Sequence, residues 1–451
     1  MATFDKKAPG VYVEEISKLP PSVASVATAI PGFVGYTERG TKNTAIRVES
    51  LIDFEEKFGY ACKIAISEED KINGLEYKLH ESMRLFYANG GGICYVVSVG
   101  NYTDAISNTA LETGISMLEP IDEVTMIVVP DAVSLEIKDL ASVQNAALAQ
   151  CLELKDRVAI LDVKDTGNCN KDATNFRNSI GTKGASYGAA YYPYIKSVYD
   201  REINVYDIYK GLELSNQELE NAQYYAELSE PTEESTLFAK QLMSKPEYAK
   251  LVAKIQEQAN LLPPSGAIAG IYCANDNQRG VWHAPANMSV SGISDINVRI
   301  SDKQQGELNE NTSGKCINAI RAFQGKGILV WGARTLDGLS SEWKYISVRR
   351  FFNYVEESIQ ESTAWAVFQP NDANTWVKVR CQIENFLSNL WRDGALAGST
   401  PQEAFYVRVG INQTMTAQDI LNGYMIVEIG MAAVRPAEFI VLQFSHKLQE
   451  S

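Results

Sequence analysis

The chain has only three histidines, and His80, His283 and His446 stand far apart in the sequence. Catalytic histidines normally work with a carboxylate or a cysteine held beside them, and none of the three has an evident partner of this kind. The GxSxG, HExxH, Walker A and EF-hand motifs are missing as well. These absences predict a non-enzymatic protein without a catalytic site, a metal site or a cofactor.

The seven cysteines are odd in number and scattered, with no CxxC pair. Disulfide frameworks of secreted proteins use even numbers of cysteines. The first ten residues contain Asp5 and no apolar core, unlike a signal peptide. No apolar run approaches the length of about 20 residues that a membrane-spanning helix needs. We therefore expect reduced thiols, a cytosolic folding compartment and no direct membrane insertion.

Clusters of basic residues are also missing. The 451 residues include 41 Lys and Arg against 56 Asp and Glu, a net charge of −15 at pH 7. Binding to nucleic acid needs clustered cations that neutralise phosphates, and an anionic membrane surface attracts cations too. Both partners are therefore disfavoured. The chain is long enough for two or three domains with substantial cores, and its hydrophobic fraction of 45% is ordinary for a globular protein.

Short apolar runs alternate with helix-like segments over residues 105–193. The runs VTMIVVP, DRVAILDV and GAAYYP are separated by helical patterns at 140–154 and 172–180. Such alternation predicts βαβ units and a mostly parallel sheet. Asp131 and Asp162 fall at or just beyond strand ends, where α/β enzymes place metal or phosphate ligands, although an aspartate there is also a common helix cap. A soluble α/β enzyme that uses these two carboxylates is therefore the alternative function.

The stretch 205–262 has a helical and acidic pattern. Ser215 followed by Glu218, and Pro246 after a serine and a lysine, are typical helix starts. The pair Pro263-Pro264 marks the return to the main domain. We interpret the stretch as an insertion on the outer surface.

Two terminal segments alternate in the manner of a strand but have no hairpin partner beside them. An unpaired strand cannot satisfy its own backbone hydrogen bonds, so it needs an edge supplied from elsewhere. A frayed terminus is the alternative for the first segment. The strand-like residues of the two segments are Val11, Tyr12, Val13, Phe439, Ile440, Val441, Leu442 and Phe444.

One long helix is predicted after a cap at Asn371 or Asp372. Its apolar positions recur every three or four residues and face a core; they are Trp376, Val379, Ile383, Phe386, Leu387 and Leu390. The opposite stripe contains amides, two cations and no carboxylate, and consists of Lys378, Gln382, Asn385, Asn389 and Arg392. In so acidic a chain this stripe is a candidate contact surface, with a solvated helix face as the alternative.

Several motifs together resemble the contractile tail sheath family, which occurs in phage tails, R-type pyocins and extracellular contractile injection systems. They are PGVYVEE, PGFVGYTERG, DFEEKFG, LFYANGGGICYVVSVG, LPPSGAIAGIYCANDNQRGVWHAPAN and the closing segment from GILVWGARTL to RPAEFIVLQFSHK. They cover both ends and roughly half of the chain, in family order. The middle is less typical.

The resemblance implies a structural subunit that forms a helical homopolymer around an inner tube and contracts to drive the tube through a target envelope. The two terminal segments would be intersubunit arms that complete a β-sheet with neighbouring subunits. The polar stripe of the long helix would contact the inner tube. The implied partners are the chain itself, in stacked six-fold rings, sheath paralogues, the tube protein, baseplate proteins, and terminator or cap proteins. The implied setting is a phage tail, or a released tail-like particle, assembled in the bacterial cytoplasm; the acidic insertion favours an injection system.

We accordingly expect an α/β subunit with an α+β core, an inserted βαβ domain and extended arms at both ends. The expected parts are an N-terminal arm (1–29), the first part of the core (30–100), the inserted α/β domain (101–202), the helical acidic insertion (203–262), the second part of the core (263–436) and a C-terminal arm (437–451).

Overall fold

The computed structural model describes residues 23–67, 71–228, 230–310 and 312–439. The chain divides into two compact units, which we describe separately. The sheet unit comprises Val26–Glu356 and Val434–Ser451, and the ribbon unit comprises Met1–Ser25 and Glu357–Ala433. Within the described residues, no helix is both long enough and apolar enough to cross a membrane.

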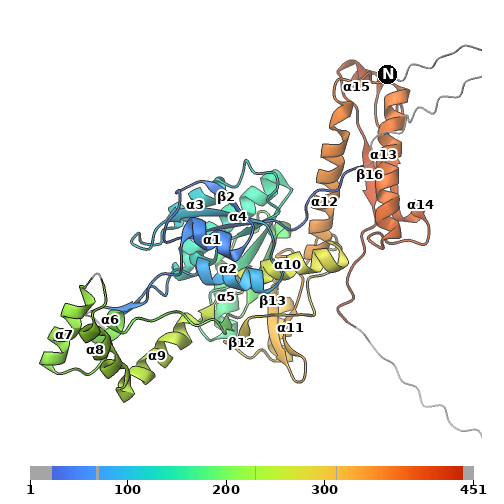
Figure 1. The fold of residues 1–451 in the computed structure, drawn as a ribbon. Coiled ribbons are helices and arrows are strands. Elements are labelled where there is room, and N and C mark those ends of the chain that lie inside the picture. The colour runs from blue at the N-terminus through green and yellow to red at the C-terminus, as the bar shows by residue number, and fades with distance from the viewer. Residues whose placement is uncertain (1–22, 68–70, 229, 311, 440–451) are drawn as a thin grey trace, which may run out of the picture. The chain divides into compact units, whose positions relative to one another are not determined.

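A nine-stranded sheet forms the centre of the sheet unit (Figure 1). Its order is β11 (Met288–Ser289), β14 (Gly327–Trp331), β13 (Ile317–Phe323), β8 (Gly188–Tyr192), β7 (Val158–Asp162), β6 (Met126–Val128), β1 (Pro31–Tyr36), β5 (Cys94–Gly100) and β2 (Ala45–Val48). The six strands from β13 to β5 are parallel to one another, whereas β2, β14 and β11 are antiparallel to their neighbours. The mostly parallel sheet predicted from the alternating pattern is confirmed.

Helices cover both faces of this sheet, and successive residues of each strand therefore enter different cores. In β1, Phe33 packs with one buried cluster and Val34 with the other. One face carries α3 (Asn108–Ser116), α4 (Ile137–Leu154) and α5 (Cys169–Ser179). The other carries α1 (Leu51–Phe58), α2 (Leu79–Ala88) and α10 (Ser265–Arg279). Burial on both faces explains why the central strands are nearly continuous apolar runs.

A capping serine and two glycines define the ends of α1 and α2. The side chain of Ser50 accepts a hydrogen bond from the Asp53 amide at the start of α1, and Gly59 ends this helix with a φ of 85°. The α2 helix likewise stops at Asn89 and Gly90, the latter with a φ of 96°. Positive φ at a helix end is the ordinary role of glycine.

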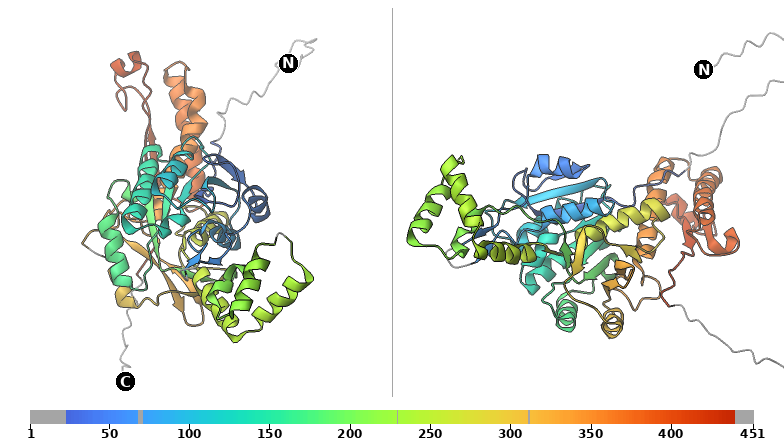
Figure 2. Two further views of the ribbon diagram at one scale, coloured as in Figure 1. Left: turned by 90° about the vertical axis from the view of Figure 1, so that its left-hand side faces the viewer. Right: turned by 60° about the horizontal axis from the view of Figure 1, so that its bottom comes forward.

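The acidic stretch folds as a small helical bundle (Figure 2). The bundle contains α6 (Val205–Ile208), α7 (Asn216–Ala226), α8 (Glu233–Met243) and α9 (Pro246–Ala259). Ser215 and Glu218 form a capping box at α7, as their spacing predicted. Ile208 and Ile255 also pack against Ile64 and Ile66, and β10 (Leu261–Leu262) pairs with β9 (Ile195–Ser197). The bundle is therefore built into the sheet unit.

Three smaller features complete the sheet unit. The strand β12 (Ile293–Ile296) pairs with β9, and β3 (Ala65–Ile66) pairs with β4 (Ile72–Asn73). The helix α11 (Asp302–Asn309) begins with a capping box between Ser301 and Gln304.

The α/β class is confirmed, but the structure corrects the expected boundaries at residues 100, 202 and 262. Strands from 30–100, 101–202 and the region after 263 all belong to the one sheet. The reason is that β1 hydrogen-bonds to β5 on one side and to β6 on the other. A segment whose strands lie in the middle of a shared sheet is not a separate domain.

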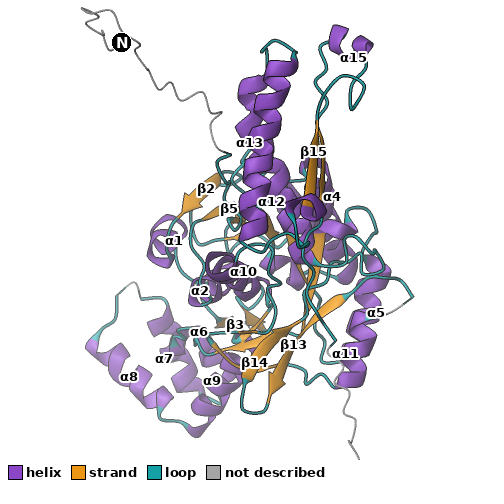
Figure 3. Cartoon of the chain, turned by 90° about the vertical axis from the view of Figure 1, so that its right-hand side faces the viewer, coloured by secondary structure: helices purple, strands orange, loops and turns teal. Residues whose placement is uncertain are grey.

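The ribbon unit is built from helices and one pair of strands (Figure 3). It contains the end of α12 (Ile346–Thr363), followed by α13 (Ala373–Arg392), α14 (Pro401–Ala404), β15 (Phe405–Arg408), α15 (Ala417–Leu421) and β16 (Glu428–Met431). As predicted, Asp372 caps α13, accepting a hydrogen bond of 3.0 Å from the Thr375 amide. β15 and β16 pair in antiparallel register, from Phe405 opposite Met431 to Arg408 opposite Glu428. Among the described residues no third strand joins this pair.

Candidate functional site: anchors of the two terminal segments

Asp131 lies in the short 3-10 turn that follows β6 and is fully buried. Its carboxylate accepts backbone hydrogen bonds from Tyr36 (2.6 Å), Lys78 (2.5 Å) and Leu79 (2.9 Å). Burial raises the pKa of Asp131 to about 6, although these hydrogen bonds favour the charged form. The side chain thus joins the end of one strand to the beginning of α2, which is the helix-cap role and not an enzymatic one.

Asp162 repeats this arrangement at the end of β7. Its carboxylate accepts a hydrogen bond of 2.9 Å from the amide of Ser265, the first residue of α10. Burial raises the pKa of Asp162 to about 7. Both carboxylates are closed off from solvent, so neither is open to a substrate.

The histidines differ from the expectation in one respect. His80 is buried, and its Nε2 lies 3.3 Å from Oε1 of Glu55, a carboxylate partner contributed by α1. Burial lowers the pKa of His80, so the imidazole is neutral at pH 7. His283 uses its carbonyl to accept a hydrogen bond from the Asn275 side chain. His446 lies outside the described residues.

The chain's last described residues are held to the sheet unit by Arg334. Its Nε and Nη2 donate to Oε1 and Oε2 of Glu438 at 2.9 and 2.6 Å, and the Arg334 side chain is only 2% exposed. The hydroxyl of Tyr345 donates to Oε2 of Glu438 at 3.1 Å. Burial alone would raise the pKa of Glu438, but the hydrogen bonds and charge of Arg334 outweigh it and lower the pKa. We call this ion pair the C-terminal anchor.

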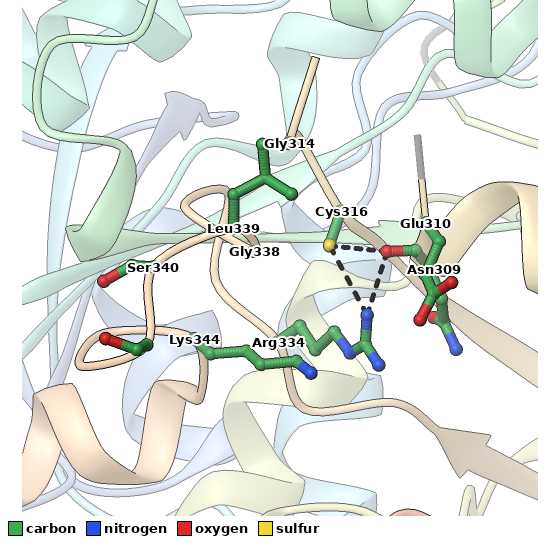
Figure 4. Close-up of a pocket in the computed structure, with 10 residues that line it drawn as sticks. Asn309, Glu310, Gly314, Cys316, Arg334, Gly338, Leu339, Ser340 and Lys344 are labelled. Atoms are coloured by element: carbon green, nitrogen blue, oxygen red, sulfur yellow. Dashed lines mark hydrogen bonds between the residues drawn. The ribbon is translucent and has the colours of Figure 1, made fainter. Parts of the chain in front are cut away.

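Arg334 is itself fixed from several sides. The Asn318 side chain on β13 accepts from the Arg334 amide at 2.7 Å and donates to its carbonyl at 2.8 Å. The Arg334 Nη1 donates to the Asn309 carbonyl at 3.0 Å, beside the Cys316 thiol (Figure 4). Arg334, Asn309 and Cys316 line a cavity of about 340 Å³ that Lys344 borders. Because its backbone and guanidinium are both held, Arg334 presents a preformed fork to a carboxylate.

Arg350 on α12 holds the other end of the chain. Its Nη2 donates to the Thr28 carbonyl at 2.9 Å, just before β1. Its two terminal nitrogens also reach the Asp276 carboxylate at 2.9 and 2.6 Å, and both side chains are nearly fully buried. The guanidinium lies 4.7 Å from the centroid of the Tyr272 ring. We call this contact the N-terminal anchor.

The two anchors give the terminal segments fixed roots. A desolvated arginine held bidentately by a carboxylate is specific in geometry, and breaking such a pair is costly because a buried charge is left behind. The chain therefore has a fixed position next to each terminal segment, at Thr28 and at Glu438.

The predicted arm residues lie mostly beyond the described part of the chain. Outside it are Val11, Tyr12, Val13, Ile440, Val441, Leu442 and Phe444. Phe439 is the last described residue, and 72% of its surface is exposed.

The polar stripe of α13 needs one correction. Lys378, Asn385, Asn389 and Arg392 are exposed, but Gln382 is only 2% exposed. Gln382 accepts a hydrogen bond from Trp365 Nε1 at 2.8 Å and donates to the Ser362 carbonyl at 3.0 Å. Its amide satisfies polar groups between α12 and α13, which helical spacing alone did not indicate.

Sequence reasoning missed both anchoring arginines. A signal was present, because Arg334 follows the apolar strand GILVW and Arg350 stands between VR and FF in an apolar stretch. Arginine is almost never buried unless it is paired. Arginines in buried surroundings therefore call for partners, but the sequence does not say which ones.

Two family models match the chain in adjoining regions. The model described as the phage tail sheath protein central domain matches residues 104–336, and the phage tail sheath C-terminal domain matches residues 340–447. Over 192 residues the chain is 23% identical to the tail sheath protein of Vibrio phage KVP40, and over 126 residues it is 25% identical to that of Enterobacteria phage T4. These matches cover 42% and 28% of this chain, and they span only 27% and 19% of the two relatives.

Solved structures align over nearly the whole chain. The contracted sheath complex of PVC, an extracellular contractile injection system, is 32% identical with a TM-score of 0.69, covering 99% of both chains. The contracted helical sheath of the anti-feeding prophage is 30% identical with a TM-score of 0.67, covering 98% of this chain and 99% of that one.

Proposed function

Because this chain belongs to the contractile tail sheath family, we propose that it polymerises into a helical sheath around an inner tube and contracts to drive that tube through a target envelope. The observation that carries this proposal is the alignment, over nearly its whole length, with two contracted sheaths. The alternative of an enzyme that uses Asp131 and Asp162 has no support, because both carboxylates are buried helix caps.

We propose that the ribbon of β15 and β16 receives the arms of neighbouring subunits. A two-stranded ribbon is marginally stable by itself, and its outer edges carry unpaired backbone groups. The anchored segments have the complementary need, since an alternating apolar strand must find an edge. Main-chain pairing depends little on side-chain detail, and at about 1 kcal/mol for each hydrogen bond a few residues make a tether of several kcal/mol.

The experiment for the tether is Val441→Pro. Proline removes a ladder donor and cannot sit inside a paired strand, so sheath formation should be lost. The thermal midpoint of the free subunit should change little. Gln449→Pro, beyond the apolar stretch, is the matched control and should assemble normally. A large fall in the stability of the free subunit would show that this segment is an integral part of its own fold, and normal assembly of Val441→Pro would remove the tether.

We also propose that the exposed part of the α13 stripe faces the inner tube. Lys378 and Arg392 would meet acidic groups there, with Asn385 and Asn389 between them. Each exposed pair contributes only about 0.2 to 1 kcal/mol, but the contact is repeated in every subunit. Gln382 is excluded from this surface by its burial.

The remaining partners follow from the same reading. We expect copies of this chain in stacked six-fold rings, sheath paralogues, a baseplate, and terminator or cap proteins, all assembled in a bacterial cytoplasm. One relative is a sheath of an extracellular contractile injection system, which supports a released particle of that kind. Electron microscopy of the purified chain with its tube protein tests this, since an outcome with monomers alone would contradict it.

A further inference from the structure

A groove of about 710 Å³ lies beside the C-terminal anchor in the sheet unit. Its apolar surface comes from Ala284 and Ala286, from Trp331 and Ala333 at the end of β14, and from Tyr345. All five side chains are buried or half-buried. The volume falls within the range of pockets that enclose a ligand of drug size, so the groove can take several side chains.

The rim of the groove is polar and rigid. Arg321 on β13 is held by Asp302 at 2.8 Å and by the Gln305 side chain at 2.7 Å. Gln305 also donates to the Trp331 carbonyl at 2.9 Å. Next to the groove lies β11, which among the described residues pairs only with β14 and so leaves its outer edge open. Apolar walls, polar rim groups and an open strand edge are what an extended peptide requires.

The chain itself leads into this groove. Residues 436–439 form part of its wall, with Glu438 fixed by Arg334 and Phe439 the last described residue. Twelve more residues follow Phe439, beginning with the apolar alternation of Ile440, Leu442 and Phe444. An extended stretch from 440 to 444 spans about 17 Å.

We infer that in the free subunit residues 440–444 occupy this groove of their own chain, and that they leave it when a neighbour's ribbon offers a better edge. Residues 440–444 follow directly on the anchored Glu438, so their binding to the groove is intramolecular. Their effective concentration at the groove is of the order of millimolar, and even a weak site is filled. The groove then shields an apolar strand that would otherwise promote aggregation. The occupied groove does not depend on the proposed function, whereas the release step does.

Hydrogen exchange on the dilute full-length subunit tests the inference. Amides 440–444 should exchange roughly fivefold or more slowly than in Ala284→Glu, which places a carboxylate among the apolar walls near Glu438. The matched control is Ala61→Glu at a half-buried loop alanine that does not line the groove. This control should keep the protection. Equal exchange in the wild type and Ala284→Glu would overturn the inference.

A cross-link identifies the occupant. Ala286→Cys combined with Leu442→Cys should form a disulfide in the dilute subunit, whereas Ala61→Cys with Leu442→Cys should not. In a mixture of isotope-labelled and unlabelled chains, the linked peptides should carry a single label type. Mixed labels would assign the groove to a neighbour's segment and overturn the inference.

Assembly separates this inference from the proposed function. Ala284→Glu should polymerise with a shorter lag than the wild type, because the segment is already free. If Val441→Pro abolishes assembly while the wild-type segment shows no protection, the tether stands and the groove inference falls. If protection is present and Val441→Pro still assembles, the groove inference stands and the tether falls.

Discussion

Arg334 and Arg350 hold the two ends of the chain by different kinds of acceptor. Arg334 forms an ion pair with the side chain of Glu438. Arg350 instead donates to the main-chain carbonyl of Thr28, and its own charge is paired with Asp276. Removing Glu438 therefore leaves Arg334 buried without a counter-ion. At Thr28 a side-chain substitution leaves the carbonyl in place. The two anchors should therefore respond differently to substitution.

We expect Glu438→Gln to weaken the C-terminal anchor. The amide keeps one acceptor but loses the charge that compensates Arg334, so the free energy of unfolding should fall by about 1–3 kcal/mol. Asp295→Asn is the control, because its pair with Arg299 is exposed and such pairs contribute about 0.2–1 kcal/mol. Urea denaturation of the free subunit measures both. Equal losses of unfolding free energy in the two variants would show that the C-terminal anchor stabilises the fold no more than an exposed ion pair does.

Asp162 predicts an unusual pH dependence. Its folded-state pKa is about 7, above the ordinary value of 3.8. The folded chain therefore binds this proton more tightly than the unfolded chain, and this group adds stability as the pH falls from about 7 towards about 4. Asp162→Asn keeps an oxygen for the Ser265 amide and has no proton to gain. From about pH 8 to pH 5 the wild type should gain stability relative to the variant. The difference between their free energies of unfolding should change by roughly 1–3 kcal/mol over this range.

Subtracting the two pH profiles removes the contribution of Asp131, which is present in both proteins. Denaturation midpoints at a series of pH values provide the measurement. Parallel profiles would mean that Asp162 does not titrate in this window.

At the scale of elements, α13 shows how one helix face divides between two roles. Four of the five stripe residues face outward, while Gln382 faces inward and joins the helix to the turn after α12. A period of 3.6 residues places side chains on a face, but a neighbouring turn decides how much of that face is covered.

This division gives a paired prediction. Lys378→Glu with Arg392→Glu should reduce co-sedimentation with the tube protein and leave the thermal midpoint within about 2 °C, since isolated surface charges contribute little to folding. Gln382→Leu should lower the thermal midpoint and leave co-sedimentation with the tube protein unchanged. The midpoint falls because the Trp365 indole and the Ser362 carbonyl lose their hydrogen-bond partner. The expected cost of Gln382→Leu is about 1–3 kcal/mol. Normal co-sedimentation of the double variant would remove α13 from the tube interface.

At the scale of the whole molecule, the sequence predicted what is encoded locally. The cap at Asp372, the capping box at Ser215 and the βαβ alternation depend on residues a few positions apart, and all three were predicted. The anchors join residues far apart: Arg334 and Glu438 are separated by 104 in residue number, and Arg350 and Thr28 by 322. No periodicity connects such pairs. The same holds for β1, whose two neighbours come from segments that pattern reasoning had assigned to different domains.

The helical bundle tests the corrected domain map. Replacing residues 205–261 with a short Gly/Ser linker would uncover Ile64 and Ile66, which pack on this bundle. Their exposure should cost about 1.5–3 kcal/mol each. We therefore expect reduced solubility from the simple deletion and recovery when Ile64→Thr and Ile66→Thr are added. Size-exclusion chromatography reports solubility, and electron microscopy reports assembly. Insolubility of the combined variant would make the bundle indispensable to the fold.

The route of the chain determines which part bears a mechanical load. The chain leaves the sheet unit within α12, builds the ribbon unit and returns at Val434 to the grip of Arg334 on Glu438. A pull on the residues after Phe439 is therefore taken up by Arg334 and the large sheet before it reaches β16. A pull on the segment after Phe439 would therefore leave β15 and β16 unloaded and free for the pairing that we propose.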